Sequence, residues 1–182
     1  GDILGSAGEH YWNLAHGIDD RRVIPDREAK SISHETTFAE DVRDQEVLKA
    51  WLSELVEQVA RRLRRHELRG RTVEIKVRFS DFQTITRSIT MPEPSNVTHE
   101  LYLAGLQLLT TKLPPRHLPV RLLGFGMKGL DGSGTSQRQL FDEPERQKHR
   151  QIDRVADEIA AKFGKQALRR GPAPEDHGNG GR

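Results

Sequence analysis

The stretch "RTVEIKVRFSDFQTITRSIT", residues 71 to 90, decides the fold. Its first half alternates strictly between apolar and charged residues, which is the two-residue period of a β-strand with one buried face. The apolar set is Val73, Ile75, Val77 and Phe79, and the outward set is Glu74, Lys76 and Arg78. The connection "SDFQ" leads to a second strand, "TITRSIT", so we predict a β-hairpin.

Further elements lie on each side of this hairpin. The segment "KSISHETTF", residues 30 to 38, is rich in β-branched and hydroxyl residues and predicts a strand that turns Ile32 and Phe38 to one side. Residues 44 to 66 and 98 to 113 have helical apolar spacing. We expect "MPEPSN" to end the hairpin at Met91, and "VRLLGFGMKGL", residues 120 to 130, to form the last strand.

The predicted order is strand, helix, strand, strand, helix, strand. This order is typical of an α+β domain of the β-α-β-β-α-β type, in which two helices cover one face of a four-stranded sheet. The other face would then be bare and polar, with hydroxyl and cationic groups that can bind phosphate oxygens. Any half-buried sheet also shows a polar outer face, so alternation alone leaves both interpretations open. The residues of this face are Ser31, Ser33, Lys76, Arg78, Thr84, Thr86 and Ser88.

The flanking segments suggest four parts. Residues 6 to 16 predict a short helix that ends at Gly17, and residues 18 to 29 predict a linker. Residues 30 to 129 form the predicted domain, and residues 130 to 182 a tail. Within the tail, residues 145 to 163 predict a helix, and "GPAPEDHGNGGR" has the composition of a disordered segment. The apolar stripe of this helix is Ile152, Val155, Ala156, Ile159 and Phe163.

Composition limits the classes of function. The 182 residues carry 29 Lys and Arg against 27 Asp and Glu, a net charge of +2, and contain no cysteine. Disulfide frameworks and cysteine zinc sites are therefore excluded, and no apolar run approaches the roughly 20 residues of a membrane span. We expect a fragment of a longer cytoplasmic protein. Six arginines between positions 61 and 71 suit either phosphate backbones or a solvated helix end.

No motif in the sequence predicts catalysis. The stretch "GFGMKG" matches G-x-G-x-x-G, but "LDGSGTS" follows where a dinucleotide site needs a helix. Gly124 is better explained by crowding inside a strand. The eight histidines lack metal-ligand spacing, and no nucleophile elbow is present. We therefore predict no catalytic residue and no metal site in this chain.

Several of these stretches together resemble the C-terminal part of bacterial Y-family DNA polymerases of the DNA polymerase IV type. The resemblance rests on "KSISHETTF", "VRFSDFQTITRSIT", "VRLLGFGMKGL" and "QRQLF" in family order and spacing, and runs from about residue 4 to residue 170. It implies that residues 1 to 17 end the thumb, 18 to 29 are the tether, and 30 to 129 are the little finger. That domain lays its sheet in the DNA major groove and grips backbone phosphates.

The resemblance also implies particular site residues. The motif positions expected to contact the DNA backbone are Lys30, Ser31, Ser33, Thr86, Arg87, Ser88 and Arg121, while Lys76 and Arg78 are added from alternation alone. "QRQLF" resembles the bacterial sliding-clamp motif, in which Gln137, Leu140 and Phe141 would enter a pocket on the clamp; Arg138 departs from the commoner apolar residue. Burial of the Leu-Phe pair against its own sheet is the alternative.

The resemblance places catalysis outside this chain. The family's palm and fingers hold the carboxylates that bind two Mg²⁺ ions, and they have no counterpart here, so this chain alone is not expected to polymerise. We expect a monomer that binds double-stranded primer-template DNA and the clamp, without a membrane. Two alternatives stay open: an inactive relative that acts as an adaptor in mutagenesis, and a ferredoxin-like RNA-binding or protein-interaction module. An RNA-binding module of this kind would need aromatic residues on the bare face of the sheet, whereas Phe38 and Phe79 belong to the apolar side.

Overall fold

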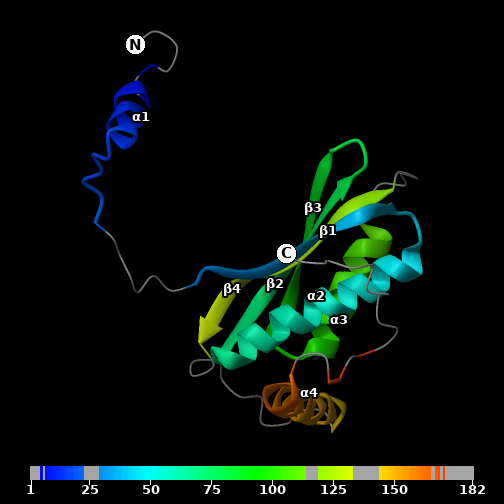
Figure 1. Cartoon of the computed structure of the whole chain (residues 1–182). Coiled ribbons are helices and arrows are strands. Elements are labelled where there is room, and N and C mark those ends of the chain that lie inside the picture. Colours follow the sequence, from blue (N-terminus) through cyan, green and yellow to red (C-terminus); the bar gives the residue numbers. More distant parts are fainter. Residues whose placement is uncertain are drawn as a thin grey trace.

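The computed structural model describes residues 5, 7–22, 29–113, 119–132, 144–164, 167, 168 and 170 (Figure 1). Its elements follow the predicted order, with one helix before the domain and one after it. The bounds are α1 Ala7–Ala15, β1 Ser31–Val42, α2 Gln45–Arg65, β2 Leu68–Phe79, β3 Thr84–Ser95, α3 Thr98–Thr111, β4 Val120–Gly132 and α4 Pro144–Phe163. The α+β fold predicted from the sequence is therefore confirmed. None of the helices in the described part of the chain is long and apolar enough to cross a membrane.

The four strands form one antiparallel sheet in the order β1-β4-β2-β3. β1 and β2 are each antiparallel to β4, which lies between them, so they run parallel to each other and are joined by α2. In the same way β3 and β4 are each antiparallel to β2, which lies between them. They therefore also run parallel to each other, and α3 joins them. The fold thus consists of two interlocked split β-α-β units, as the sequence predicts.

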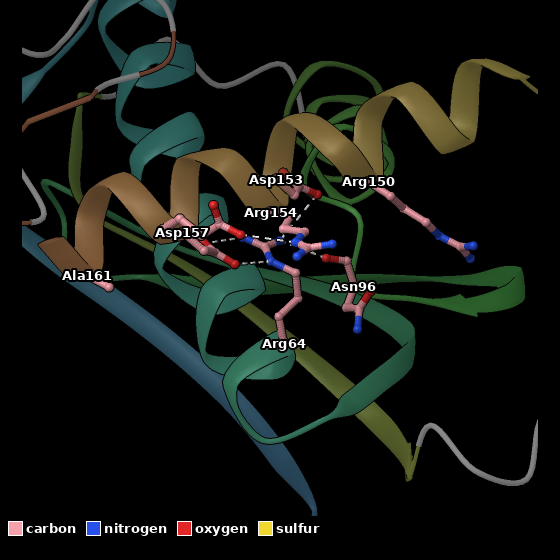
Figure 2. A pocket seen from close by; sticks show the side chains of 8 residues that line it. Arg64, Asn96, Arg150, Asp153, Arg154, Asp157 and Ala161 are labelled. Atoms are coloured by element: carbon pink, nitrogen blue, oxygen red, sulfur yellow. Dashed lines mark hydrogen bonds and ion pairs between the residues drawn. The ribbon is translucent and has the colours of Figure 1, made fainter.

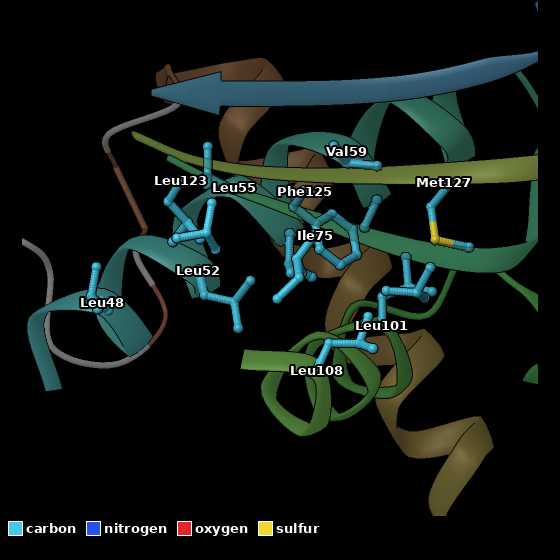
Figure 3. Close-up of a cluster of buried hydrophobic side chains, with 14 of the residues drawn as sticks. Leu48, Leu52, Leu55, Val59, Ile75, Leu101, Leu108, Leu123, Phe125 and Met127 are labelled. Carbon is cyan, nitrogen blue, oxygen red and sulfur yellow. The ribbon is translucent and has the colours of Figure 1, made fainter. Parts of the chain in front are cut away.

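The core lies between the sheet and the two helices α2 and α3 (Figure 3). The alternation of β2 sends Val73, Ile75 and Val77 into it with no exposed surface. Phe125 of β4 lies at its centre and approaches Gly105 of α3, where an added Cβ would come within 3.1 Å of the ring. A side chain at this helix position would push α3 off the sheet, so the small residue sets the distance between the two layers.

β3 continues further than we predicted. The expectation that the hairpin ends at Met91 is wrong, because the strand runs on to Ser95 through Pro92 and Pro94. Two facts make the prolines acceptable. β3 is an edge strand, and its pairing with β2 shifts register between Gly70 and Thr72. Proline lacks an amide hydrogen, and edges and bulges are where a strand tolerates that loss.

α2 is well defined at both ends. The Asp44 carboxylate accepts a hydrogen bond from the Glu46 amide at 2.8 Å, which caps the first turn. Arg62, Arg64 and Arg65 occupy the last turn, where positive charge is favoured by the helix dipole. The arginine cluster seen in the sequence is thus in part a helix end, and Arg64 turns away from the sheet to contact α4.

α4 docks on the domain through its charged face (Figure 2). Asp153 is 1% exposed and accepts a hydrogen bond from the Thr98 amide at 2.9 Å, so it caps α3, whose own N-cap residue Val97 provides no side-chain bond. Arg64 binds Asp157 with two hydrogen bonds of 2.6 and 2.9 Å. Together these contacts fix α4 at the end of the helical layer, away from the open side of the sheet.

The apolar stripe predicted for α4 is not the docked face. Ile152, Val155 and Phe163 are 42%, 47% and 67% exposed, whereas Ala156 is buried at 3%. The helix is rotated because the arginines of α2 form ion pairs with its acidic residues. α1 has no buried residue, and its Tyr11 and Trp12 are more than half exposed.

Candidate nucleic-acid interface

The face of the sheet opposite α2 and α3 is built of four rows of side chains. Strand register places one residue of each strand in every row, and each row is two residues from the next along the strands, so all of these side chains project from the same side. We call this surface the open face. Its rows, in the order β1, β4, β2, β3, are Ser31, Lys128, Thr72, Thr90; Ser33, Gly126, Glu74, Ser88; Glu35, Gly124, Lys76, Thr86; and Thr37, Leu122, Arg78, Thr84.

Gly124 and Gly126 of β4 place no side chain in the middle of the open face. A Cβ added at Gly124 would lie 3.2 Å from the Glu35 Cβ and 3.4 Å from the Lys76 Cβ, and one at Gly126 would lie 3.0 Å from the Ser33 Cβ. The crowding predicted at Gly124 is therefore present. Without side chains at these positions, residues of β1 and β2 meet across β4, and the Lys76 ammonium reaches the Glu35 carboxylate at 2.9 Å.

The open face is less cationic than its sequence pattern suggests. Lys76 pairs with Glu35, and Lys128 pairs with Glu74 at 2.6 Å. The fifth charge of these rows, Arg78, donates to the Thr84 hydroxyl at 2.9 Å. Three cations stand against two carboxylates in the four rows, an excess of one positive charge. Because these pairs are partly exposed, they contribute little to stability and can exchange for other partners.

Six of the nine predicted DNA-contacting residues lie together on the open face. The six are Ser31, Ser33, Lys76, Arg78, Thr86 and Ser88. Lys30 is exposed and directly precedes β1. Lys128, Glu35 and Glu74 are the other charged residues of these rows. Lys128 was not predicted as a site residue, although it is two residues from Gly126 and four from Gly124, a spacing that puts all three on the same side of a strand.

Arg87 lies on the other side of the sheet from Thr86 and Ser88. Its register partner is Ile75, a core residue, and its guanidinium donates to the Lys112 backbone carbonyl at 3.1 Å, at the C-terminal end of α3. Neighbouring residues of a strand point to opposite faces, so three consecutive residues cannot share one. A DNA contact by Arg87 stays a prediction, and its position here is that of a helix cap.

Arg121 occupies a register shift at one end of the sheet. Its neighbours Val120 and Leu122 pair with Phe79 and Arg78 of β2, which leaves Arg121 itself without a partner in the ladder. The guanidinium lies 4.9 Å from the ring centroid of Phe82 and 3.5 Å from the Asp41 carboxylate. It therefore borders the open face at the β2–β3 turn. Phe82, which is 64% exposed, was not singled out from the sequence.

The two phenylalanines that the sequence assigns to the apolar side of the sheet are buried. Phe38 and Phe79 are 8% and 3% exposed and belong to the core, and none of the sixteen residues in the open-face rows is aromatic. The stacking platform that an RNA-binding module needs is therefore missing from these rows.

The predicted clamp-binding residues Gln137, Leu140 and Phe141 lie outside the described residues.

These features define a one-sided α+β sheet domain, with helices on one face and a polar, mixed-charge surface on the other. Residues 29–140 match the model of the impB/mucB/samB family C-terminal domain, and the chain belongs to this family, the C-terminal domain of Y-family polymerases.

Relatives extend the match beyond the domain. The chain is 37% identical over 168 residues to DNA polymerase IV of Dehalococcoides mccartyi (strain CBDB1), covering 92% of this chain and 42% of the relative. It is 40% identical over 163 residues to DNA polymerase IV of Desulfatibacillum aliphaticivorans, covering 88% and 41%. The chain thus spans about two fifths of the length of these curated relatives.

Solved structures are similar as well, and one of them contains a domain together with its partner. It is described as a complex of the beta-clamp processivity factor and the little finger domain of PolIV, and it aligns with a TM-score of 0.47 and 25% sequence identity. The alignment covers 61% of this chain and 96% of that one.

Proposed function

We propose that this chain is the DNA-binding, little-finger portion of a translesion DNA polymerase, and that its open face grips the backbone of primer-template duplex. The supporting observation is the set of four hydroxyl-rich and charged rows on a sheet face that α2, α3 and α4 leave uncovered. Hydroxyls, lysines and arginines are the groups that contact phosphates in protein–DNA complexes.

The grip would be indifferent to base sequence. Most polar ends on the open face are short serine and threonine hydroxyls, and these reach phosphates without distinguishing base pairs. Lys76, Lys128 and Arg78 would supply charge, after Lys76 and Lys128 exchange their carboxylate partners for phosphates. A polymerase that moves along its template needs this kind of contact, because its register on the duplex changes with every nucleotide added.

The polymerase activity itself would reside in the rest of a longer protein. In the described part of the chain no three acidic or histidine side chains lie close enough to hold a metal ion, so these residues do not fit the Mg²⁺ ions of nucleotidyl transfer. Positioning of the duplex is the contribution that we assign to this portion. We further propose that it acts as a monomer in the cytoplasm.

Recruitment by the bacterial sliding clamp is the second part of the proposal. It rests on the sequence "QRQLF", in which Gln137 and the pair Leu140 and Phe141 have the spacing of a clamp-binding motif. Replacing both apolar residues with alanine should abolish binding to purified clamp, because such anchors carry most of the energy of a small interface. Unchanged clamp binding by that variant would remove this part of the proposal and leave the DNA grip intact.

The DNA grip is tested by the salt dependence of duplex binding. Each cation that meets a phosphate adds about 0.9 to the slope of log affinity against log salt concentration. The double variant Lys76→Gln, Arg78→Gln should therefore lower the slope by about two, equally for duplexes of different sequence. The matched control Lys49→Gln, Arg154→Gln removes the same charge from α2 and α4 and should leave the slope unchanged. Affinity that depends on base sequence, or equal slopes for both variants, would contradict the proposal.

A further inference from the structure

Among the described residues between β1 and β4, Phe82 is the most exposed large apolar side chain, at 64%. It lies in the β2–β3 turn, which projects from one end of the sheet in Figure 1. Its φ of 64° falls in the left-handed region, which a bulky residue seldom adopts. Unfavourable backbone geometry combined with an exposed ring is a feature that occurs at functional sites.

The turn holds this conformation through three hydrogen bonds. The Phe82 amide donates to the Phe79 carbonyl at 2.9 Å, and the Phe79 amide donates to the Gln83 carbonyl at 3.0 Å. The Asp81 carboxylate accepts from the Gln83 amide, also at 3.0 Å. The ring is therefore presented by a backbone that is fixed before any partner arrives, which lowers the entropic cost of binding.

Arg121 fixes the ring from one side. Its guanidinium lies 4.9 Å from the ring centroid, within the range of a cation–π contact, and Asp41 holds the same guanidinium at 3.5 Å. Arg78 lies in the open-face row nearest the turn. The Phe82 ring thus lies against Arg121, and the turn that carries it directly follows the open-face row of Arg78.

The small apolar surface at Phe82 indicates which kind of partner it can bind. Ser80, Asp81 and Gln83, the neighbours of Phe82 in the turn, are polar, so Phe82 is the one apolar side chain that this turn exposes. A protein partner would need a patch many times larger. One aromatic ring beside one arginine matches a single nucleobase and its phosphate, since bases stack on aromatic side chains while cations bind the backbone.

We propose that Phe82 and Arg121 form a stacking site for an unpaired base of DNA next to the duplex that the open face holds. The base lies against the ring, and Arg121 orients the ring and attracts the neighbouring phosphate. This proposal rests on the proposed DNA grip, because it places the base where the duplex ends. Stacking tolerates any base, so the site adds affinity for single-stranded template without adding sequence preference.

The test compares two oligonucleotides of equal length and charge, one of thymidines and one of abasic sugar-phosphates, each joined to the same short duplex. The wild-type chain should bind the thymidine overhang more tightly. Phe82→Ala should remove that difference with a loss of about fivefold or more, the effect of one stacked base. Phe82→Leu keeps apolar bulk and should lose nearly as much, and Leu103→Ala, which truncates an exposed residue of α3, should lose nothing.

Two readouts separate stacking from a merely structural role. Phe82→Ala should leave the salt slope unchanged, whereas Arg121→Gln should lower it by about one. Phe82→Trp should retain binding. Its fluorescence in excess of that of the wild-type chain, which contains Trp12 and Trp51, should be quenched by the thymidine overhang and not by the abasic one.

The outcomes also separate this proposal from the proposed DNA grip. If the wild-type chain binds plain duplex but does not distinguish thymidine from abasic overhangs, the stacking site is wrong and the grip stands. If Phe82→Leu folds and binds both overhangs as the wild type does, the site is likewise wrong. It is also wrong if the thymidine overhang does not quench the fluorescence of the tryptophan in Phe82→Trp. Absence of any duplex binding would instead refute the grip on which this site depends.

Discussion

Replacing Asp153 with alanine should detach α4 and weaken the domain to which it binds. The side chain is 1% exposed and accepts from the Thr98 amide at 2.9 Å, while its other oxygen binds Arg170 at 2.6 Å. Its loss removes the only side-chain cap found at α3 among the described residues and one carboxylate partner of Arg64, which lies 3.3 Å away. The change thus affects two helices at once.

The expected loss in the free energy of unfolding is the sum of two contributions. A lost N-cap costs about 1 kcal/mol, and a broken buried ion pair costs about 3 to 5 kcal/mol when the partner is left without compensation. Arg64 keeps its two hydrogen bonds to Asp157, so the second cost is reduced. We expect a total of about 2 to 4 kcal/mol for Asp153→Ala. Asp153→Asn retains an acceptor for Thr98 and should cost about 1 to 2 kcal/mol.

Urea unfolding followed by circular dichroism measures this loss, and amide hydrogen exchange at Thr98 shows whether the cap has opened. The control Glu158→Ala is on the same helix and breaks an exposed pair with Arg154, so it should change the free energy of unfolding by less than about 0.5 kcal/mol. If Asp153→Ala unfolds like Glu158→Ala and the Thr98 amide stays protected, the docking of α4 through Asp153 is refuted.

Three further predictions concern the sheet and its charges. Glu35→Gln frees Lys76 and removes a negative charge from the open face, so duplex affinity at low salt should rise, by up to about fivefold, and an unchanged or lower affinity would argue against a phosphate contact there. Gly70→Ala places a Cβ 2.7 Å from the Met127 methyl and should lower the free energy of unfolding by about 1 to 3 kcal/mol in urea titration; full wild-type stability would show that the contact relaxes freely. Burial raises the pKa of Glu57 above its usual 4.5, so this group stabilises the fold at low pH and loses that contribution as pH rises through the raised pKa. Glu57→Gln should therefore remove a fall in stability above about pH 4.5, and identical pH profiles for variant and wild type would contradict this.

The fold was predictable because its strands and helices have strong periodicity. Val73, Ile75 and Val77 alternate with charged residues, and the two helices carry broad apolar stripes. The continuation of β3 through Pro92 was not predictable from local signals. Whether a proline-containing segment can remain a strand depends on its being at an edge of the sheet, and strand order is a property of the whole chain.

Most of the open face was predictable for the same reason, and the two positions that local patterns did not indicate have physical causes. Arg87 was grouped with its neighbours through a motif, although the period of two turns it to the helical side, where it caps α3. The pairing of Lys76 with Glu35 was hidden because the two residues are on strands that do not touch, and only Gly124 between them lets the side chains meet.

The side of α4 that contacts the domain could not be predicted from the apolar spacing of the sequence. Apolar spacing identifies the stripe of Ile152, Val155 and Phe163, and in a surface helix such a stripe normally faces the core. Here the contacts of Arg64 with Asp153 and Asp157 turn a neighbouring, charged side of the helix to the domain. Ion pairs between distant segments have no periodic signature, so Asp153 and Asp157 resembled ordinary surface residues.

The central claim is that duplex DNA meets the open face and not the helical one, and site-directed crosslinking tests it most directly. The chain contains no cysteine, so a single cysteine carries a photo-crosslinker at one defined place. Ser88→Cys places the crosslinker on the open face, and Gln107→Cys places it on the exposed side of α3. We predict that primer-template duplex is captured from Ser88→Cys, at several positions along the DNA, and not from Gln107→Cys. Equal capture from both positions, or capture from α3 alone, would contradict the account.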